Sequence, residues 1–229
     1  MSIKEKINLI QQRISRAAVS AERNPGDIKI LGVSKRIRSE AVIEAYNAGL
    51  LDFGENYAQE FRDKHGLLSQ DLVNAKWHFI GHLQKNKIKY VIGKAELIHS
   101  VNSINLAEEI NTRSEGLGIK TNILIEINSG GEDTKTGISF SDAQKLIKEI
   151  NGLKNISFKG LMTMAPYFDD PELARPYFKE LKLFSNEVRK NHTEATEISM
   201  GMSGDFEVAV EEGSTIVRIG SAIFGERTS

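Results

Sequence analysis

The sequence predicts an α/β protein built as a single (β/α)8 barrel of the TIM type, with one extra helix at its N-terminus. Short apolar runs that are typical of strands alternate with amphipathic stretches from end to end. Such alternation implies parallel strands joined by right-handed crossovers. About eight strand–helix units follow one another, which is the count of a closed barrel. An open doubly wound sheet is the alternative, and we disfavour it because no Gly-x-Gly-x-x-Gly motif follows the first strand.

The expected elements follow in order along the chain. The extra helix is expected over 3–23, where isoleucines recur at helical spacing. Strands are expected over 28–34, 51–54, 77–80, 97–101, 122–127, 158–164, 197–200 and 216–219. Helices are expected over 39–48, 56–68, 83–92, 104–114, 140–151, 172–190 and 205–212.

Capping residues mark the ends of several of these helices. Ser103 and Ser141 stand where N-caps are expected, because a serine hydroxyl accepts a hydrogen bond from a free N–H of the first turn. Glycine is common just after a helix because it adopts the left-handed conformation at little cost. Four glycines stand at such positions: Gly49, Gly93, Gly116 and Gly213.

Composition narrows the classes of function. The chain has 229 residues, a length that suits one domain spanning 1–229. Thirty basic residues balance 31 acidic ones, so electrostatics gives no case for a nucleic-acid or anionic membrane partner. The absence of cysteine excludes disulfides, thiolate metal sites and a cysteine nucleophile. No signal peptide or run of membrane-spanning length is visible, so a cytoplasmic location is expected.

Lys35 ends the first expected strand, and a helical pattern follows it almost at once. A lysine at the tip of a buried strand has an apolar stem and an amine at the rim, where partial desolvation favours the neutral form. A neutral amine can attack an aldehyde and form a Schiff base. Taken alone, a surface lysine that merely closes a strand is the better interpretation.

Two small, glycine-rich loops follow the seventh and eighth strands, where barrels commonly hold phosphate. Ser203 and Gly204 lie in the first loop, and Gly220 and Ser221 lie in the second. Backbone N–H groups can come close to an anion there, and the serines add hydroxyl donors. One such loop could simply be a tight turn, but two at the expected place favour a phosphate ligand.

Arg218 lies in the middle of the eighth strand, among apolar residues. A buried guanidinium needs a partner because an unpaired buried charge is costly. One interpretation is a salt bridge inside the barrel, with Glu126 or Glu55; the other is a donor that faces a ligand. A Schiff-base lysine and a phosphate site at one barrel mouth suggest either pyridoxal 5'-phosphate (PLP) or a sugar phosphate in a class I aldolase.

Several motifs resemble those of the pyridoxal phosphate homeostasis protein family. They match in order from Lys35 to Gly225, and the chain departs from the family at Arg36-Ile37-Arg38, where threonine, lysine and proline are common. The matching segments are 33–35 (VSK), 53–57 (FGENY), 77–84 (WHFIGHLQ), 160–164 (GLMTM), 199–205 (SMGMSGD) and 217–225 (VRIGSAIFG).

The resemblance implies a barrel like the N-terminal domain of alanine racemase, with PLP bound as a Schiff base on Lys35. It implies ring contacts from Asn56 and Met162, and Arg218 near the pyridine nitrogen. It also implies phosphate contacts from Ser203, Gly204, Gly220 and Ser221. The function implied is intracellular PLP homeostasis, that is, buffering of the cofactor and its delivery to apo-enzymes through transient contacts.

Catalysis is less favoured than binding. Arginine cannot accept a proton, so Arg218 would leave the ring nitrogen unprotonated and the ring a weak electron sink. The chain has no room for the second domain that completes a racemase site, so we expect an open site, a monomer and no catalytic residue. A PLP-dependent racemase-like enzyme is the alternative, with His82 and Tyr57 as candidate acids or bases.

Two further features bear on the site. His78 and His82 are four residues apart, but Gly81 separates strand from helix between them, so we expect no metal site. The polar, glycine-rich loop 128–137 follows the fifth strand at the active-site end, where a mobile cover or a plain surface loop would both fit.

Overall fold

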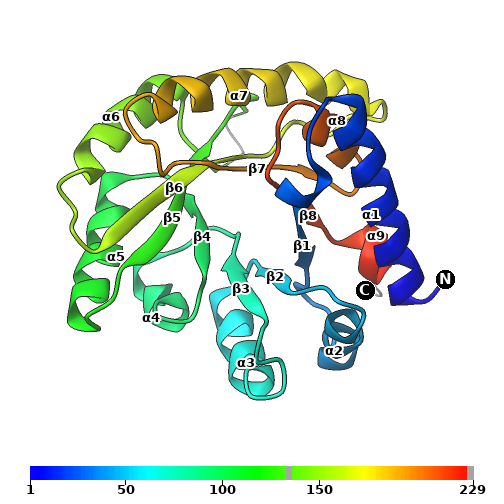
Figure 1. Cartoon of the computed structure of the whole chain (residues 1–229). Helices are drawn as coiled ribbons and strands as arrows, with labels where there is room; N and C mark the ends of the chain where they lie inside the picture. Colours follow the sequence, from blue (N-terminus) through cyan, green and yellow to red (C-terminus); the bar gives the residue numbers. More distant parts are fainter. Residues whose placement is uncertain (133–135, 226–229) are drawn as a thin grey trace.

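Eight parallel strands close into a barrel in the part of the chain that the computed structural model describes, residues 1–132 and 136–225 (Figure 1). The strands follow the sequence order, and β1 pairs with β8 to close the ring. This confirms the predicted (β/α)8 barrel. The strands are β1 (Lys29–Val33), β2 (Asp52–Glu55), β3 (Lys76–Phe79), β4 (Leu97–Val101), β5 (Thr121–Ile127), β6 (Ile156–Thr163), β7 (Glu197–Met202) and β8 (Ile216–Ile219).

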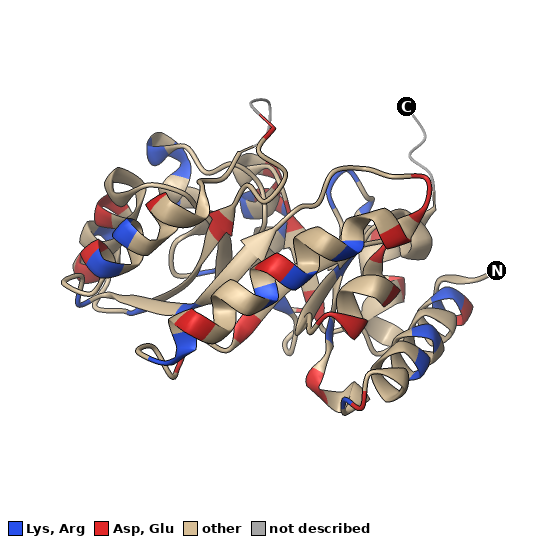
Figure 2. Ribbon diagram, turned by 90° about the horizontal axis from the view of Figure 1, so that it is seen from above, with Lys and Arg blue, Asp and Glu red and all other residues tan. Residues whose placement is uncertain are grey.

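The helices lie outside the strands (Figure 1). They are α1 (Ile3–Ser20), α2 (Ser39–Asn47), α3 (Ala58–Leu68), α4 (Ile88–Val91), α5 (Ile104–Gly116), α6 (Phe140–Ile150), α7 (Arg175–Arg189), α8 (Phe206–Glu211) and α9 (Ser221–Phe224), with 3-10 turns η1 (Pro25–Asp27), η2 (Lys85–Lys87) and η3 (Pro171–Ala174). Lys and Arg are interspersed with Asp and Glu along them (Figure 2). No described helix is long and apolar enough to cross a membrane.

The extra helix α1 lies beside α8 and α9 (Figure 1). Its start is fixed by a capping box between Ser2 and Glu5, which satisfies two N–H groups of the first turn. Arg13 forms an ion pair with Glu207 of α8 at 2.6 Å. After the helix, Arg23 donates to the backbone carbonyls of α8 and of the loop before β8. These contacts hold the N-terminal segment against α8 and the loop before β8.

Three expectations about helices were wrong. Ser139, not Ser141, caps α6: its hydroxyl accepts from the N–H of Asp142, because the extended chain ends at Ile138, which bridges to Ile127. The helix α5 continues through Gly116, and the left-handed glycine is Gly118. The expected helix 83–92 is instead η2 followed by the single turn α4, because Gln84 has an extended backbone.

The other capping predictions are confirmed. The hydroxyl of Ser103 accepts from the first turn of α5. Gly49, Gly93 and Gly213 have positive φ just beyond α2, α4 and α8. The three glycines shape loops that return a helix to the next strand, at the end of the barrel opposite its mouth, whereas Ser103 caps a helix at the mouth end.

The interior of the barrel holds a small apolar cluster and several polar side chains. The cluster comprises Leu31, Leu97, Leu124, Met162 and Ile216. A larger apolar cluster lies between the strands and the surrounding helices. Polar residues at inward positions, among them His99 and Arg218, are also almost completely buried. Buried polar groups of this kind need hydrogen-bond partners, and these partners shape the site.

Candidate functional site

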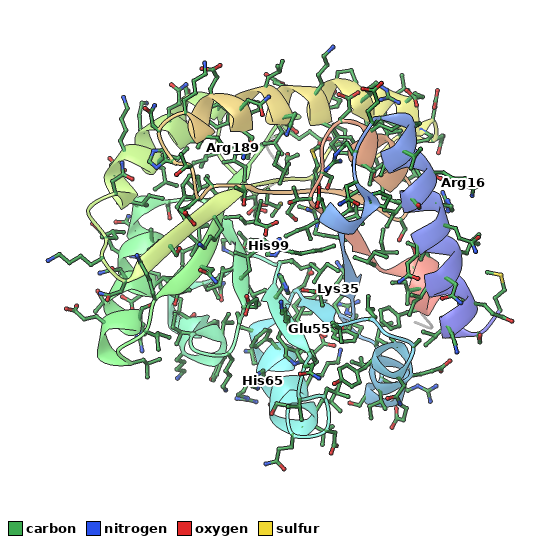
Figure 3. The ribbon with its side chains drawn as sticks, viewed as in Figure 1. Arg16, Lys35, Glu55, His65, His99 and Arg189 are labelled. Atoms are coloured by element: carbon green, nitrogen blue, oxygen red, sulfur yellow. The ribbon has the colours of Figure 1, made fainter. Side chains whose placement is uncertain are left out.

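A cavity of about 380 Å³ opens where the strands end at their carboxyl side. The loops after β1, β2, β3, β5, β6, β7 and β8 line it. This is the end at which (β/α)8 barrels place their active sites, and the volume lies in the range of small-molecule sites. Figure 3 shows His99 inside the barrel, Lys35 beside β1, Glu55 between β2 and α3, and His65 on α3 outside the barrel.

Most of the predicted site residues line this cavity. They are Lys35, Asn56, Ser203, Gly204, Arg218, Gly220 and Ser221. Met162 is not among the lining residues: it is 1% exposed and packs one layer deeper, in the apolar cluster of the barrel. Met164 lines the cavity instead. The two methionines are two residues apart, so they point to the same face, and only their depth along the barrel separates them.

Lys35 is carried by a tight turn directly after β1. The N–H of Ile37 donates to the carbonyl of Ser34 at 3.0 Å and closes the turn. Arg36 has φ +60°, a left-handed conformation that is unusual for a side chain of this size. Its N–H donates to Glu60 Oε1 at 2.5 Å, and this bond holds the turn from α3. The amine of Lys35 is therefore presented by a strained turn that needs support from neighbouring elements.

That support comes from Lys64, a buried lysine on α3. Its ammonium donates to Glu55 Oε1 at 2.9 Å, to Glu60 Oε1 at 2.7 Å and to the carbonyl of Ser34. The hydroxyl of Ser34 also donates to Glu55. Burial raises the pKa of Glu55, although the Lys64 charge and hydrogen bonds from Lys64 and Ser34 oppose this. We call Lys64, Glu55, Glu60 and Ser34 the Lys64 cluster.

The sequence reasoning missed Lys64, although a signal was present. Lys64 stands between Phe61 and Leu68 on the buried face of α3, where an apolar residue is expected. A lysine at such a position must be neutralised by buried acceptors. Glu55, at the end of a neighbouring strand, is the partner that this logic requires.

Asn56 is the next residue after Glu55 and lies against the β3 loop. A Cβ at Gly81 would lie 2.1 Å from the carbonyl oxygen of Asn56, so only glycine fits there. The side-chain oxygen of Asn56 is buried and has no hydrogen-bond partner among the described residues. A buried acceptor in this state at a cavity wall favours a ligand donor.

The two glycine-rich loops meet at Ser203. Its hydroxyl oxygen accepts from the N–H of Gly220 and of Ala222, both at 3.3 Å. Bonds of this length are weak, so both N–H groups can turn to a stronger acceptor. A Cβ at Gly204 would meet nothing within 4 Å, so the loop leaves open space beside these donors. The arrangement suits an anion that brings several oxygen acceptors.

Arg218 forms one wall of the cavity from within the barrel. It is 4% exposed and donates to Ser199 Oγ at 2.7 Å and to the carbonyl of Thr163 at 2.8 Å. Burial lowers its pKa to about 10, whereas the charges of Asp205 and Glu126 act in the opposite direction. The guanidinium therefore stays cationic at neutral pH.

The alternative of a salt bridge inside the barrel is wrong for Arg218. Within the described residues it has no carboxylate at ion-pair distance. Glu55 pairs with Lys64, and Glu126 accepts from Thr136 at 2.6 Å. The interpretation that remains is a cation whose charge faces the cavity, and burial without a close counter-charge favours an anionic or acceptor ligand.

The remaining sequence features are placed as follows. His82 lines the cavity, and His78 is buried in the barrel. No group of three or more metal-ligating side chains occurs among the described residues. Tyr57 is half exposed beneath the Arg36 guanidinium and is not part of the cavity wall. Thr136 of the loop 128–137 lines the cavity, whereas residues 133–135 lie outside the described part of the chain.

Comparison with known proteins places the chain in a family. The profile described as "Alanine racemase, N-terminal domain" matches residues 9–228. A protein of Aquifex aeolicus (strain VF5), named pyridoxal phosphate homeostasis protein, is 44% identical over 228 residues and is covered to 99%, as is this chain. The chain belongs to the pyridoxal phosphate homeostasis protein family. The human family member is 36% identical, with 96% of this chain and 85% of the human protein covered.

Solved structures of similar proteins agree with the fold. A protein of unknown function from Bifidobacterium adolescentis superposes with a TM-score of 0.92 at 33% identity, over 97% of this chain and 94% of that one. PipY of Synechococcus elongatus PCC7942, solved with PLP bound, gives 0.85 at 30% identity, over 98% and 100%. Alanine racemase of Clostridium difficile 630 gives 0.73 at 18% identity and shares the fold over 57% of its length.

Proposed function

We propose that this chain binds PLP in the cavity and serves PLP homeostasis, by buffering the cofactor and delivering it to apo-enzymes. One observation carries the proposal: an amine, two phosphate-type loops and a buried cation line the same cavity. Family members named for pyridoxal phosphate homeostasis and the PLP-bound PipY structure support it. We further propose that the protein acts as a monomer of a single domain in the cytoplasm.

The donors and acceptors of the cavity fit the chemical groups of PLP. Ser203, Gly204, Gly220 and Ser221 offer hydroxyl and N–H donors to a phosphate. The amine of Lys35 is placed to form a covalent link with an aldehyde, with loss of water. When bound, PLP supplies an electrophilic aldehyde and an electron-accepting ring.

The residues of the cavity favour holding the cofactor over catalysis. Arg218 has donors only and stays charged, so it can hydrogen-bond the ring nitrogen only in its unprotonated form. That form withdraws electrons weakly. Asp205, which also lines the cavity, accepts from the N–H of Met202 at 2.5 Å and is thereby occupied in shaping its own loop.

A racemase-like activity is the second candidate, and one observation favours it. His82 lines the cavity and is exposed, so it could carry a proton to a substrate across from Lys35. This alternative predicts that solvent deuterium enters the α-position of an amino acid, and that the exchange is lost in His82→Ala. Absence of exchange with every amino acid tested would remove it.

The test of the proposal is an absorption spectrum of the purified protein with PLP, before and after borohydride, with mass mapping of the reduced peptide. We expect a yellow band that reduction fixes onto Lys35. Lys35→Ala should lose the band and keep weaker, non-covalent binding through the phosphate loops. Lys85→Ala, a change of an exposed lysine on η2, is the matched control and should behave as the unaltered protein.

Delivery is tested separately. The PLP-loaded protein is mixed with an apo-enzyme that depends on PLP, and recovery of that enzyme's activity is followed. Recovery faster than with the same concentration of released cofactor supports direct transfer. Recovery at the rate of spontaneous release would limit the function to buffering, and a protein that PLP cannot turn yellow would overturn the proposal and return the aldolase interpretation.

A further inference from the structure

A continuous chain of hydrogen bonds crosses the interior of the barrel from Arg218 to Asp52. Arg218 donates to Ser199 Oγ at 2.7 Å, and Ser199 Oγ lies 3.0 Å from His99 Nδ1. His99 Nε2 lies 3.0 Å from His78 Nδ1, and His78 Nε2 lies 3.0 Å from Asp52 Oδ1. The chain uses side chains from β8, β7, β4, β3 and β2. It connects the cavity at one end of the barrel with the opposite end.

With both imidazole rings neutral, the chemistry of the two ends fixes every proton in between. Arg218 can only donate, and an ionised Asp52 can only accept, so His78 Nε2 carries a hydrogen. In a neutral His78, Nδ1 is then an acceptor, and His99 must donate to it from Nε2. A neutral His99 therefore has a bare Nδ1, which accepts the hydroxyl hydrogen of Ser199. All four bonds point from Arg218 toward Asp52.

His99 is suited to remain neutral in this position. His99 is completely buried, and its pKa lies well below the usual range because of desolvation and, to a smaller extent, the charges of His78, Arg218 and Lys29. His78 is 3% exposed. A proton added to either ring would put a hydrogen on His99 Nδ1, and the Ser199 oxygen would then have to accept from both Arg218 and His99 while its own hydrogen turns away.

The far end of the chain reaches a second hollow. Asp52 lines a depression of about 380 Å³ between the η1 turn and the starts of β1 and β2. The side chain of Asp52 is 19% exposed, so its carboxylate is partly hydrated. Arg218, in contrast, is buried, and its close acceptors, Ser199 Oγ and the carbonyl of Thr163, are both neutral.

We propose that Asp52, His78, His99 and Ser199 are positioning residues that act on the cofactor through Arg218. The ordered chain turns a lone pair of Ser199 toward the Arg218 guanidinium. It thereby fixes which N–H groups of Arg218 are left to donate to a ligand in the cavity. Asp52 is the remote counter-charge at the other end. This inference rests on the proposed function for the identity of the ligand, but the ordering of the chain does not depend on it.

The first experiment therefore uses the ligand-free protein. Nitrogen NMR of ¹⁵N-histidine-labelled protein reads the protonation of each ring nitrogen directly. We expect His78 and His99 to carry hydrogen on Nε2 alone throughout the neutral pH range. A cationic ring, or hydrogen on Nδ1 of either residue, would overturn the proposal. Assignment uses the loss of one pair of signals in His78→Gln and, separately, in His99→Gln.

The second experiment tests whether the charge of Asp52 affects the bound PLP. Asp52→Asn keeps an acceptor for His78 and removes the negative charge, so the positive field of Arg218 at the bound PLP is less compensated. The pH midpoint of the yellow band should fall by about 0.5–1 pH unit, the effect of one unit charge roughly 12–25 Å away at an effective dielectric constant of ~20. Asp71→Asn, which removes an exposed charge outside the barrel, should leave the midpoint unchanged.

The outcomes separate this inference from the proposed function. A midpoint that moves no further in Asp52→Asn than in Asp71→Asn would overturn the remote role of Asp52. An unaltered protein that never turns yellow would overturn the proposed function, and the NMR result would still decide the ordering of the chain. If Asp52→Asn fails to fold, Ser199→Ala cuts the chain beside Arg218, and His99 Nδ1 should then lose its donor in the same spectra.

Discussion

Lys64 and Arg218 are both buried cations close to the same cavity, and their surroundings are opposite. Lys64 contacts two carboxylates, those of Glu55 and Glu60, within 2.9 Å. Arg218 contacts a hydroxyl and a backbone carbonyl, both neutral. The first cation is neutralised by its neighbours, whereas the second has no carboxylate at ion-pair distance among the described residues and is offset only by the more distant Asp205 and Glu126.

This difference separates a residue that supports the Lys35 turn, Lys64, from a residue that recognises the ligand, Arg218. The Lys64 cluster holds the strained turn that carries Lys35. Lys64 donates to the Ser34 carbonyl on one side of the turn, and on the other side it donates to Glu60, which accepts from the Arg36 N–H. Arg218 has donors left over, because a guanidinium has five and Ser199 Oγ and the Thr163 carbonyl take one each. Changes at Lys64 should therefore act on the fold and on the turn, and changes at Arg218 should act on the ligand.

The largest expected effect is that of Lys64→Met. Removing one partner of a buried ion pair leaves Glu55 uncompensated, which typically costs about 3–5 kcal/mol of unfolding free energy. Burial already raises the pKa of Glu55, and loss of the Lys64 charge and hydrogen bond raises it further. A carboxyl with a raised folded pKa stabilises the fold at low pH and loses this contribution as pH rises through that pKa.

Urea denaturation of Lys64→Met at about pH 5 and about pH 8 checks this sign, and the deficit should be larger at the higher pH. Lys190→Met is the matched control, because Lys190 forms an exposed pair with Glu187 on the outside of the barrel. It should cost about 0–0.5 kcal/mol at both pH values. A deficit in Lys64→Met that does not change with pH would show that Glu55 is not the group left unpaired.

The fold and one side of the site could be predicted from the sequence. The alternation of strand-like and helical patterns predicts the barrel. The ends of the predicted strands point to Lys35 and to the loops of Ser203 and Gly220, because these features depend on local sequence pattern. The depth of Met162 could not be predicted, because residues two apart in a strand share a face and differ only in layer. The sequence pattern is the same for both methionines.

The partners of the buried polar groups also lay beyond local pattern. One of the two interpretations of Arg218 paired it with Glu126 or Glu55, because side chains on opposite strands of a barrel can meet in many combinations and the sequence does not distinguish them. Glu55 is taken by Lys64, nine residues further on, and Arg218 contacts Ser199 instead. Histidines inside apolar strands, such as His99, signal a buried network, yet only the three-dimensional register shows which residues complete it.

A smaller effect is expected for Arg218→Gln, which tests recognition. Loss of a charged donor to the ligand should weaken PLP binding about 10- to 100-fold, the size of one charge-assisted hydrogen bond. Equilibrium titration followed by absorbance measures it. Arg23→Gln is the control, because Arg23 also donates to backbone carbonyls but lies between α1 and α8, away from the cavity. Equal losses in both variants would remove the distinction between support and recognition.

The smallest effect is expected for Ser203→Ala, which divides recognition itself into two parts. Loss of one neutral hydroxyl donor should weaken PLP binding about 3- to 10-fold. Binding of pyridoxal, which lacks the phosphate, should not change, because Ser203 faces only the anion end of the cavity. Arg218→Gln should weaken both ligands, because the guanidinium acts on the ring. If Ser203→Ala weakened pyridoxal as strongly as PLP, the loops of Ser203 and Gly220 would not be the phosphate end, and the ligand would lie the other way round in the cavity.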